Sequence, residues 1–254
     1  MTALDILLVA AVLVGMSVQA AIGFGFAFFV APAAFAAFSP EQAVMLVLLL
    51  AIAINCLVLF GERRRTEVAV RQTATVVCAA VPGMLAGAWI VTEVDHDLLQ
   101  VLVGLIVLAG ALVQALAARA VGPAPRSAAS DDRPLTEIGG GLAAGVLTTS
   151  VSVNGPALVL IFSRLGLRGA RLRDSLAGAL LGLSLPATLI VAAFAGREGA
   201  LPEGWVLVAC VPAVLVGHRF GASVFRRLDD GSHHRAALGA AAIAGLLSIG
   251  AAFL

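Results

Sequence analysis

The chain has 254 residues, of which 61% are hydrophobic and 12% are charged, and its mean hydropathy is +1.05. A soluble domain carries about 25% charged residues, so this composition excludes an ordinary soluble protein and indicates an all-α, multi-pass membrane protein. The formal net charge of +1 gives no bias toward nucleic acid. We therefore expect the lipid bilayer, and no nucleic acid, as a partner.

The cysteines Cys56, Cys78 and Cys210 all fall in apolar runs and lack the paired spacing of a zinc site. This placement is typical of small buried hydrophobic residues with free thiols. The N-terminus lacks the basic flank of a signal peptide, so we interpret the first apolar run as part of the fold. We expect no metal, no cofactor and no catalytic residue.

The first apolar run is too long for one membrane helix. The 35 positions between Asp5 and Glu41 carry no charge. As one helix they would extend roughly 50 Å, against a hydrocarbon core of about 30 Å. We therefore predict two shorter helices, at about 4–21 and 25–38, with a break at Gly23-Phe24-Gly25.

The remaining apolar runs follow at regular intervals. Ser39 and Pro40 are typical of the N-cap and first position of a new helix. A later run is interrupted at Ser152–Pro156, where Asn154-Gly155-Pro156 favours a second helix restart. The predicted runs are about 41–61, 67–91, 98–118, 135–163, 174–195, 203–222 and 235–253.

The two halves of the chain repeat one plan. Residues 119–134 resemble a linker, which divides a first membrane repeat (1–118) from a second (135–254). A shift of 130 positions places glycines and prolines of the first half on those of the second. This match indicates an internal duplication, which is frequent in transporters. The matches are Gly15 with Gly145, Gly25 with Gly155, Pro82 with Pro212, Leu85 with Leu215 and Gly87 with Gly217.

Arginine placement predicts the topology. Arginine gathers in the segments 62–65, 119–133, 164–173 and 219–235, which we expect to be cytoplasmic loops. The segments 92–97 and 196–203 are acidic or nearly neutral and are expected outside, with the N-terminus. The first interrupted run (4–38) then begins and ends on the outer side of the membrane. The second (135–163) begins and ends on the cytoplasmic side. We predict two inverted repeats, each a re-entrant hairpin followed by three spans.

The two breaks are the candidate substrate site. A helix that restarts inside the membrane presents unpaired N–H groups and the positive end of its dipole. Neither break contains a carboxylate, so the pattern favours an anion over a cation. Close helix packing is the alternative explanation for small and hydroxyl residues in spans. The candidate binding residues are Ser17, Gln19, Gly23, Phe24, Gly25, Thr148, Thr149, Ser150, Ser152, Asn154 and Gly155.

Four further residues are candidates for the substrate path, each with an ordinary alternative. Asn55 lies in an apolar span and either lines the path or bonds a neighbouring helix. Pro82 and Pro212 kink matching helices, which either permits movement or only shapes the packing. His218 lies near the cytoplasmic end of its span, where contact with headgroups is the alternative to substrate contact.

The breaks also resemble a known family. Gly15-x-Ser17-x5-Gly23-Phe24-Gly25 is similar to the glycine-rich segment of the TauE/SafE family of anion exporters. Gly145 through Asn154-Gly155-Pro156 is similar to its second copy, with Asn154 where members usually carry glycine. The resemblance implies export of sulfur-containing anions, such as sulfite, sulfoacetate or related organosulfonates, across the bacterial cytoplasmic membrane. It assigns binding roles only to the two breaks.

We therefore expect an alternating-access exporter of a small anion. No Asp or Glu lies deep in a predicted span, so we expect efflux driven by the membrane potential without an obligatory proton. An intramembrane enzyme would need a nucleophile with a base or a metal cluster, and no such motif is present. An uptake permease for another anion and a non-transporting scaffold are the alternatives. The sequence leaves open whether the protein is a homodimer.

Overall fold

The computed structural model describes residues 3–61, 65–119, 133–196 and 201–225, and all regular elements in these ranges are helices. The predicted all-α class is confirmed. The helices are α1 (Ala3–Ile22), α2 (Phe26–Ala37), α3 (Pro40–Phe60), α4 (Val70–Glu93), α5 (His96–Arg119), α6 (Arg133–Ser150), α7 (Gly155–Arg164), α8 (Gly169–Ala195) and α10 (Gly204–Phe225).

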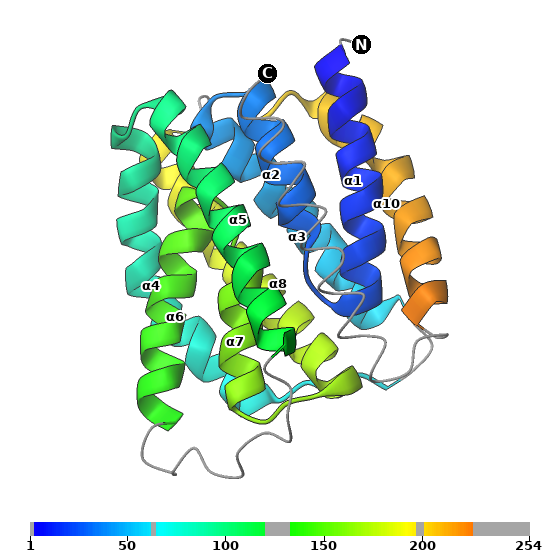
Figure 1. Ribbon diagram of the computed structural model, residues 1–254. Helices are drawn as coiled ribbons and strands as arrows, with labels where there is room; N and C mark the ends of the chain where they lie inside the picture. Colours follow the sequence, from blue (N-terminus) through cyan, green and yellow to red (C-terminus); the bar gives the residue numbers. More distant parts are fainter. Residues whose placement is uncertain (1–2, 62–64, 120–132, 197–200, 226–254) are drawn as a thin grey trace.

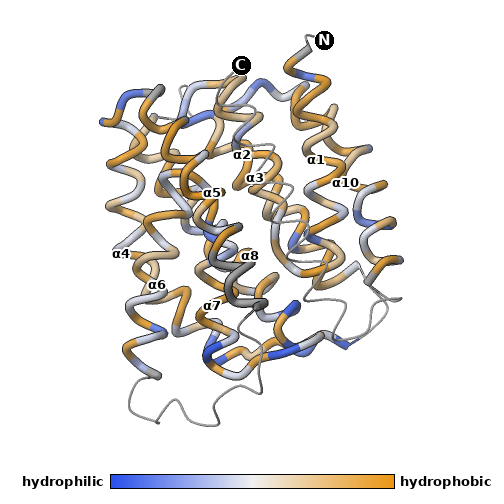
Figure 2. Tube along the Cα trace, viewed as in Figure 1, coloured by the Kyte–Doolittle hydropathy of each residue, from blue (hydrophilic) through white to orange (hydrophobic). Residues whose placement is uncertain are grey.

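Within the described residues, five helices are long and apolar enough to cross a membrane: Leu4–Ile22, Pro40–Phe60, Val70–Glu93, Gly169–Ala195 and Gly204–Val224. Figure 2 shows that hydrophilic residues gather toward the two ends of the bundle and hydrophobic ones lie between. Ser39 caps α3 as predicted, since its hydroxyl accepts the Gln42 N–H, and Pro40 begins the helix. The predicted span at 235–253 and most of the predicted linker lie outside the described residues.

Both predicted helix breaks are confirmed. The chain between α1 and α2 passes through Gly23 at φ 89° and Gly25 at φ 111°. Only a residue without a Cβ adopts this backbone readily, which explains the two glycines. In the second break Ser152 has φ 57°. Among the described residues, no other residue apart from glycine has a positive φ. Pro156 stands in the first turn of α7, where its missing N–H removes no helical bond.

The two helices of each hairpin differ in length. α1 has 20 residues and α2 has 12, or about 30 and 18 Å at about 1.5 Å per residue. A Cβ built on Gly15 would lie 2.9 Å from the Phe26 carbonyl oxygen, so α2 begins beside α1 about two turns before the end of α1. The first hairpin thus reaches across most of the bundle, and its short helix starts about a third of the way back along α1. α6 and α7, with 18 and 10 residues, form an equally unequal pair.

The hairpins enter the bundle from opposite ends (Figure 1). The outer ends of α1 and α2 lie at one end, with those of α6 and α7 at the other. The first end, here called the acidic end, carries Asp5, Glu41, Glu93, Asp95 and Glu203 at helix termini. The opposite, arginine-rich end carries Arg65, Arg71, Arg164, Arg168 and Arg171.

Each hairpin packs on a helix of the other half. α1 packs against α10, α6 packs against α4, and α3 and α8 meet between them. Glycines permit these close approaches. A Cβ on Gly217 would lie 2.9 Å from the Met16 Cβ, and one on Gly87 would lie 2.4 Å from the Val146 carbonyl oxygen. Any larger residue at these positions would push the paired helices apart.

One predicted loop is partly helical. The basic segment 164–173 was expected to be a loop, but α8 begins at Gly169 and includes its last residues. The sequence Ala170-Arg171-Leu172-Arg173 is rich in strong helix formers, which favours this extension. Arg173 is consequently buried inside the bundle, with 2% of its surface exposed.

Candidate functional site

A small cavity lies where the two short helices begin. Its volume is about 30 Å³, enough for one or two water molecules. It is lined by Gln19, Gly25, Phe26, Ala27, Val47, Leu48, Ala51, Asn55, Thr148, Ser152, Asn154, Gly155, Leu180 and Ser184. None of these fourteen side chains is ionisable, so the polar lining consists of amides, hydroxyls and backbone groups.

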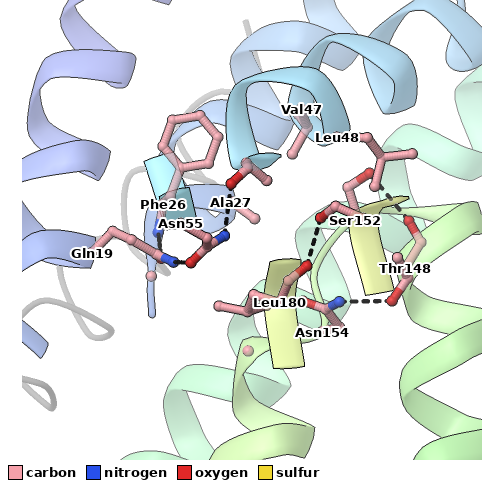
Figure 3. A pocket seen from close by; sticks show the side chains of 14 residues that line it. Gln19, Phe26, Ala27, Val47, Leu48, Asn55, Thr148, Ser152, Asn154 and Leu180 are labelled. Carbon is pink, nitrogen blue, oxygen red and sulfur yellow. Dashed lines mark hydrogen bonds between the residues drawn. The ribbon is translucent and has the colours of Figure 1, made fainter. Parts of the chain in front are cut away.

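One side of the cavity is organised by Gln19, which is buried in the last turn of α1 (Figure 3). Its Oε1 accepts the N–H of Phe26 at 3.2 Å, and its Nε2 donates to Asn55 Oδ1 at 2.9 Å. The Asn55 amide in turn donates to the Ala51 carbonyl at 2.8 Å. Gln19 therefore caps α2 from outside that helix and joins α1, α2 and α3 at the cavity wall.

The facing side is built by the second break. Asn154 Nδ2 donates to Thr148 Oγ1 at 2.6 Å, and Thr148 Oγ1 donates to the Ala144 carbonyl at 2.6 Å. Ser152 Oγ donates to the Thr148 carbonyl at 3.3 Å. Figure 3 shows Thr148, Ser152 and Asn154 across the cavity from Gln19 and Asn55. Polar side chains from both halves of the chain thus meet around one space.

The breaks also touch each other. A Cβ on Gly155 would lie 3.2 Å from Phe24 Cδ2, so the Phe24 ring packs directly on the first turn of α7. The same ring meets Phe28 edge to face, with centroids 6.4 Å apart. Pro156 is held from the outside by α5, since a Cβ on Gly110 would lie 2.6 Å from its Cγ.

Two helix N-termini therefore face a space without charged side chains. The first N–H groups of a helix lack intrahelical partners, and the N-terminus carries about half a positive charge. In α2 the N–H of Phe26 is occupied by Gln19, whereas the Asn154 side chain makes no capping bond to α7. Such a site favours an anion, and the α7 end is the more available of the two.

Seven of the predicted residues line this cavity: Gln19, Gly25, Thr148, Ser152, Asn154 and Gly155 from the breaks, and Asn55 from the candidate path. Two others shape the breaks without lining the cavity. Phe24 packs on Gly155, and Gly23 lies against the backbone of α8.

Three predicted hydroxyl residues point elsewhere. Ser17 donates to the Leu13 carbonyl on its own helix, and Ser150 donates to the Val146 carbonyl. Thr149 donates to the Met84 carbonyl at 2.7 Å and so joins α6 to α4. These three therefore serve helix structure and packing in this conformation.

The other candidate path residues lie away from the cavity. Pro82 and Pro212 are inside α4 and α10, on their exposed faces. His218 is in α10, and its side chain lies beside the C-terminal end of α3, where a Cβ on Gly61 would be 3.3 Å from its Nε2.

Sequence reasoning missed α8 as a wall of the site. Leu180 and Ser184 line the cavity, and Ser184 Oγ donates to the Leu180 carbonyl at 2.7 Å. The repeat gave only a weak signal for Ser184, because a shift of 130 places it on Ile54, the neighbour of Asn55. The match is therefore one position out of register, and the shift alone would not have found Ser184.

A buried acid was also missed. Asp174 lies in the second turn of α8, near the arginine-rich end and not deep in the span, but it is completely buried inside the protein, which the sequence did not predict. Its Oδ1 lies 3.7 Å from Arg173 Nη1, and neutralisation by this cation makes the burial tolerable. The charged pair lies on the cavity-lining helix but outside the cavity.

Comparison with protein families gives a match over nearly the whole chain. The family model described as Sulfite exporter TauE/SafE matches residues 7–250, which include both breaks and every cavity-lining residue. No curated protein and no solved structure gave a match.

Proposed function

The chain belongs to the sulfite exporter TauE/SafE family, a family of membrane anion transporters, and on that premise we propose that it exports small sulfur-containing anions such as sulfite or sulfoacetate. The observation that carries the proposal is the uncharged cavity at which α2 and α7 both begin. An anion there is stabilised by amide and hydroxyl donors and by two helix dipoles, without a fixed cation that would hold it too tightly for release.

The donors are suited to an oxyanion. The amides of Gln19, Asn55 and Asn154 each have two N–H bonds, and the contacts described above use one of each. We propose that the second N–H of each amide binds a ligand oxygen. An oxyanion has several oxygens that can each accept from a different donor, so it fits this set of donors better than a halide does.

Transport requires the cavity to open, because about 30 Å³ is too small for an organosulfonate. We propose alternating access between two inverted repeats. The shift of 130 relates Gly87 to Gly217 and Met16 to Val146. In the fold Gly87 lies against Val146 and Gly217 against Met16. This exchange of equivalent partners between halves is what a two-fold inverted repeat produces, and rocking of such repeats opens a site to each side in turn.

The membrane potential supplies the direction. An inside-negative potential favours outward movement of an anion by about 2.3 kcal/mol per charge per 100 mV. The positive-inside rule assigns the arginine-rich end to the cytoplasmic side of a bacterial inner membrane. Cargo would enter at the arginine-rich end and leave at the acidic end.

Binding is tested by thermal shift of the purified protein with sulfite, sulfoacetate, taurine, sulfate and acetate. We expect the sulfur oxyanions to raise the melting temperature of the wild type and not that of Asn154→Leu. Thr75→Val is the matched control, because this hydroxyl bonds the Arg71 carbonyl on α4, away from the cavity. Equal stabilisation of Asn154→Leu by every anion would place the site elsewhere.

Transport and its direction are tested in proteoliposomes with imposed potentials. Anion efflux from the arginine-rich side supports export, and flux only in the other direction would favour the uptake alternative. Absence of flux for every anion in the panel would support a non-transporting protein.

A further inference from the structure

We infer that Arg173, together with Asp174 and Ser175, forms a latch that closes the cavity toward the arginine-rich end and must open in each transport cycle. The inference rests on the proposed function, since a latch matters only if a ligand passes. It makes Arg173 a positioning residue, which acts on the first hairpin rather than on the anion.

The first part of the latch holds the end of α1. Arg173 Nε donates to the Ala20 carbonyl oxygen at 3.0 Å, and Nη2 donates to the same oxygen. Ala20 is in the last turn of α1, where carbonyls lack intrahelical partners and the helix dipole is negative. A guanidinium is therefore matched to this helix end by both hydrogen bonding and charge.

The second part holds the approach to α4. Asp174 Oδ2 accepts the N–H of Glu67 at 2.8 Å, and Ser175 Oγ accepts the N–H of Ala69 at 2.9 Å. Val70 begins α4 directly afterwards. Three consecutive residues of α8 thus bind two separate elements of the first half of the chain.

The contact leaves no room at the first break. A Cβ on Gly23 would lie 2.8 Å from the Arg173 carbonyl oxygen and 2.9 Å from its Cα. The backbone of the break and the backbone of α8 are therefore in direct contact. A route between α1 and α8 toward the arginine-rich end is shut while this contact lasts.

The latch and the cavity share one helix, α8. Leu180 lies seven residues after Arg173, which is about two turns or 10 Å along α8. Movement of α8 that frees Arg173 would therefore also displace Leu180 and Ser184 at the cavity wall. This links opening of the route to the shape of the binding site.

The chemistry of the contact suits repeated opening. A buried ion pair is a weak source of stability, because desolvation offsets the attraction. Well-packed apolar residues would hold the helices as firmly, but hydration would not stabilise them once the route opens. A guanidinium and a carboxylate are hydrated as soon as the route opens, so the open state is less unfavourable. The shift of 130 places Ala43 opposite Arg173, so this charged latch is not repeated in the first half.

The test is side-specific labelling of Ser184→Cys with a membrane-impermeant thiol reagent, in whole cells and in inside-out vesicles. The signal of protein without Ser184→Cys is subtracted to remove Cys56, Cys78 and Cys210. We expect Arg173→Met to raise the labelling rate about tenfold from the arginine-rich face and to leave the rate from the acidic face unchanged. Arg171→Met, an exposed arginine two positions away, is the matched control and should change neither rate.

Two milder variants cover the case in which Arg173→Met does not fold. Arg173→Lys keeps the charge with one nitrogen, and Asp174→Asn keeps an acceptor for Glu67 without the ion pair. Each should raise labelling from the arginine-rich face about threefold. Unchanged labelling in folded variants, or an equal rise from both faces, would overturn the latch.

A second readout separates the latch from the proposed function. In Arg173→Lys the maximal flux should fall about tenfold while the anion dissociation constant changes less than threefold. Labelling needs no substrate, so its outcome decides the latch even if no anion is carried. An anion that is transported normally by Arg173→Met would overturn the latch and leave the proposed function intact.

Discussion

Phe24 of the first break rests on Gly155 of the second, with 3.2 Å between its Cδ2 and the position a Gly155 Cβ would take. This is the point at which the two hairpins, which enter from opposite ends of the bundle, meet (Figure 1). The contact fixes the distance between the N-termini of α2 and α7, and therefore the width of the cavity between them.

Replacing Gly155 with alanine should slow transport without unfolding the protein. The new methyl group requires the Phe24 ring to move by a few tenths of an ångström, which separates the breaks. We expect Gly155→Ala to lower the initial flux about threefold to tenfold in proteoliposomes. Phe24→Leu in the same chain provides space and should restore at least half of the lost rate. Failure of this second change to restore any flux would show that the contact does not set the rate.

Gly23 should tolerate alanine far less well than other glycines of similar conformation. Gly23 has φ 89° and faces the Arg173 backbone at 2.8 Å, whereas Gly166 has φ 83° and nothing within 4 Å. Left-handed backbone costs both alanines about 1–2 kcal/mol, and only Gly23→Ala adds a backbone clash. Thermal denaturation in detergent should show a clearly larger loss for Gly23→Ala than for Gly166→Ala. Equal losses would mean that the break does not press on α8.

The sequence predicted those features of the fold that leave a one-dimensional signal. An apolar run longer than the bilayer is thick must break, and the glycines show where, as Gly23 and Gly25 confirm with their positive φ. The second break was found from Asn154 and Pro156 in the same way. Arginine counts separated the two ends of the bundle before any helix was placed.

Contacts between distant helices left weaker signals. Arg173 belongs to a run of arginines that resembles any cytoplasmic loop. Its partner is a backbone carbonyl 153 positions away, and a backbone carbonyl cannot be predicted as a partner from the residue type that carries it. Hydroxyls could not be sorted from sequence either, because Thr148 and Thr149 are adjacent but face the cavity and α4 respectively. The side of the helix that each occupies depends on how α6 packs.

Changing Gln19 should separate its two roles. Gln19→Glu keeps an acceptor for the Phe26 N–H but places a negative charge in the uncharged cavity. Repulsion at short range in a poorly hydrated site should weaken anion binding at least tenfold. The loss of the donor to Asn55 Oδ1 and the burial of a charge should also lower the melting temperature. Gln19→Leu removes the cap of α2 and should lower stability by about 0.5–2 kcal/mol.

Both effects are measured on one preparation, the first by anion titration and the second by thermal denaturation without anion. Thr75→Val again serves as the control. Undiminished anion affinity in Gln19→Glu would show that the ligand does not occupy this cavity.

Efflux should depend on the membrane potential and not on a pH gradient. The cavity lining has no ionisable side chain, so an anion crosses as a net charge, and each 100 mV should change the equilibrium ratio about fiftyfold for every unit of charge carried. In proteoliposomes with the potential clamped, removing a pH gradient should leave the flux unchanged. A flux that stops with the pH gradient would instead implicate a carboxylate. Asp174, fully buried in α8, would be the first candidate, and Asp174→Asn should then abolish the pH dependence while retaining exchange of anion against anion.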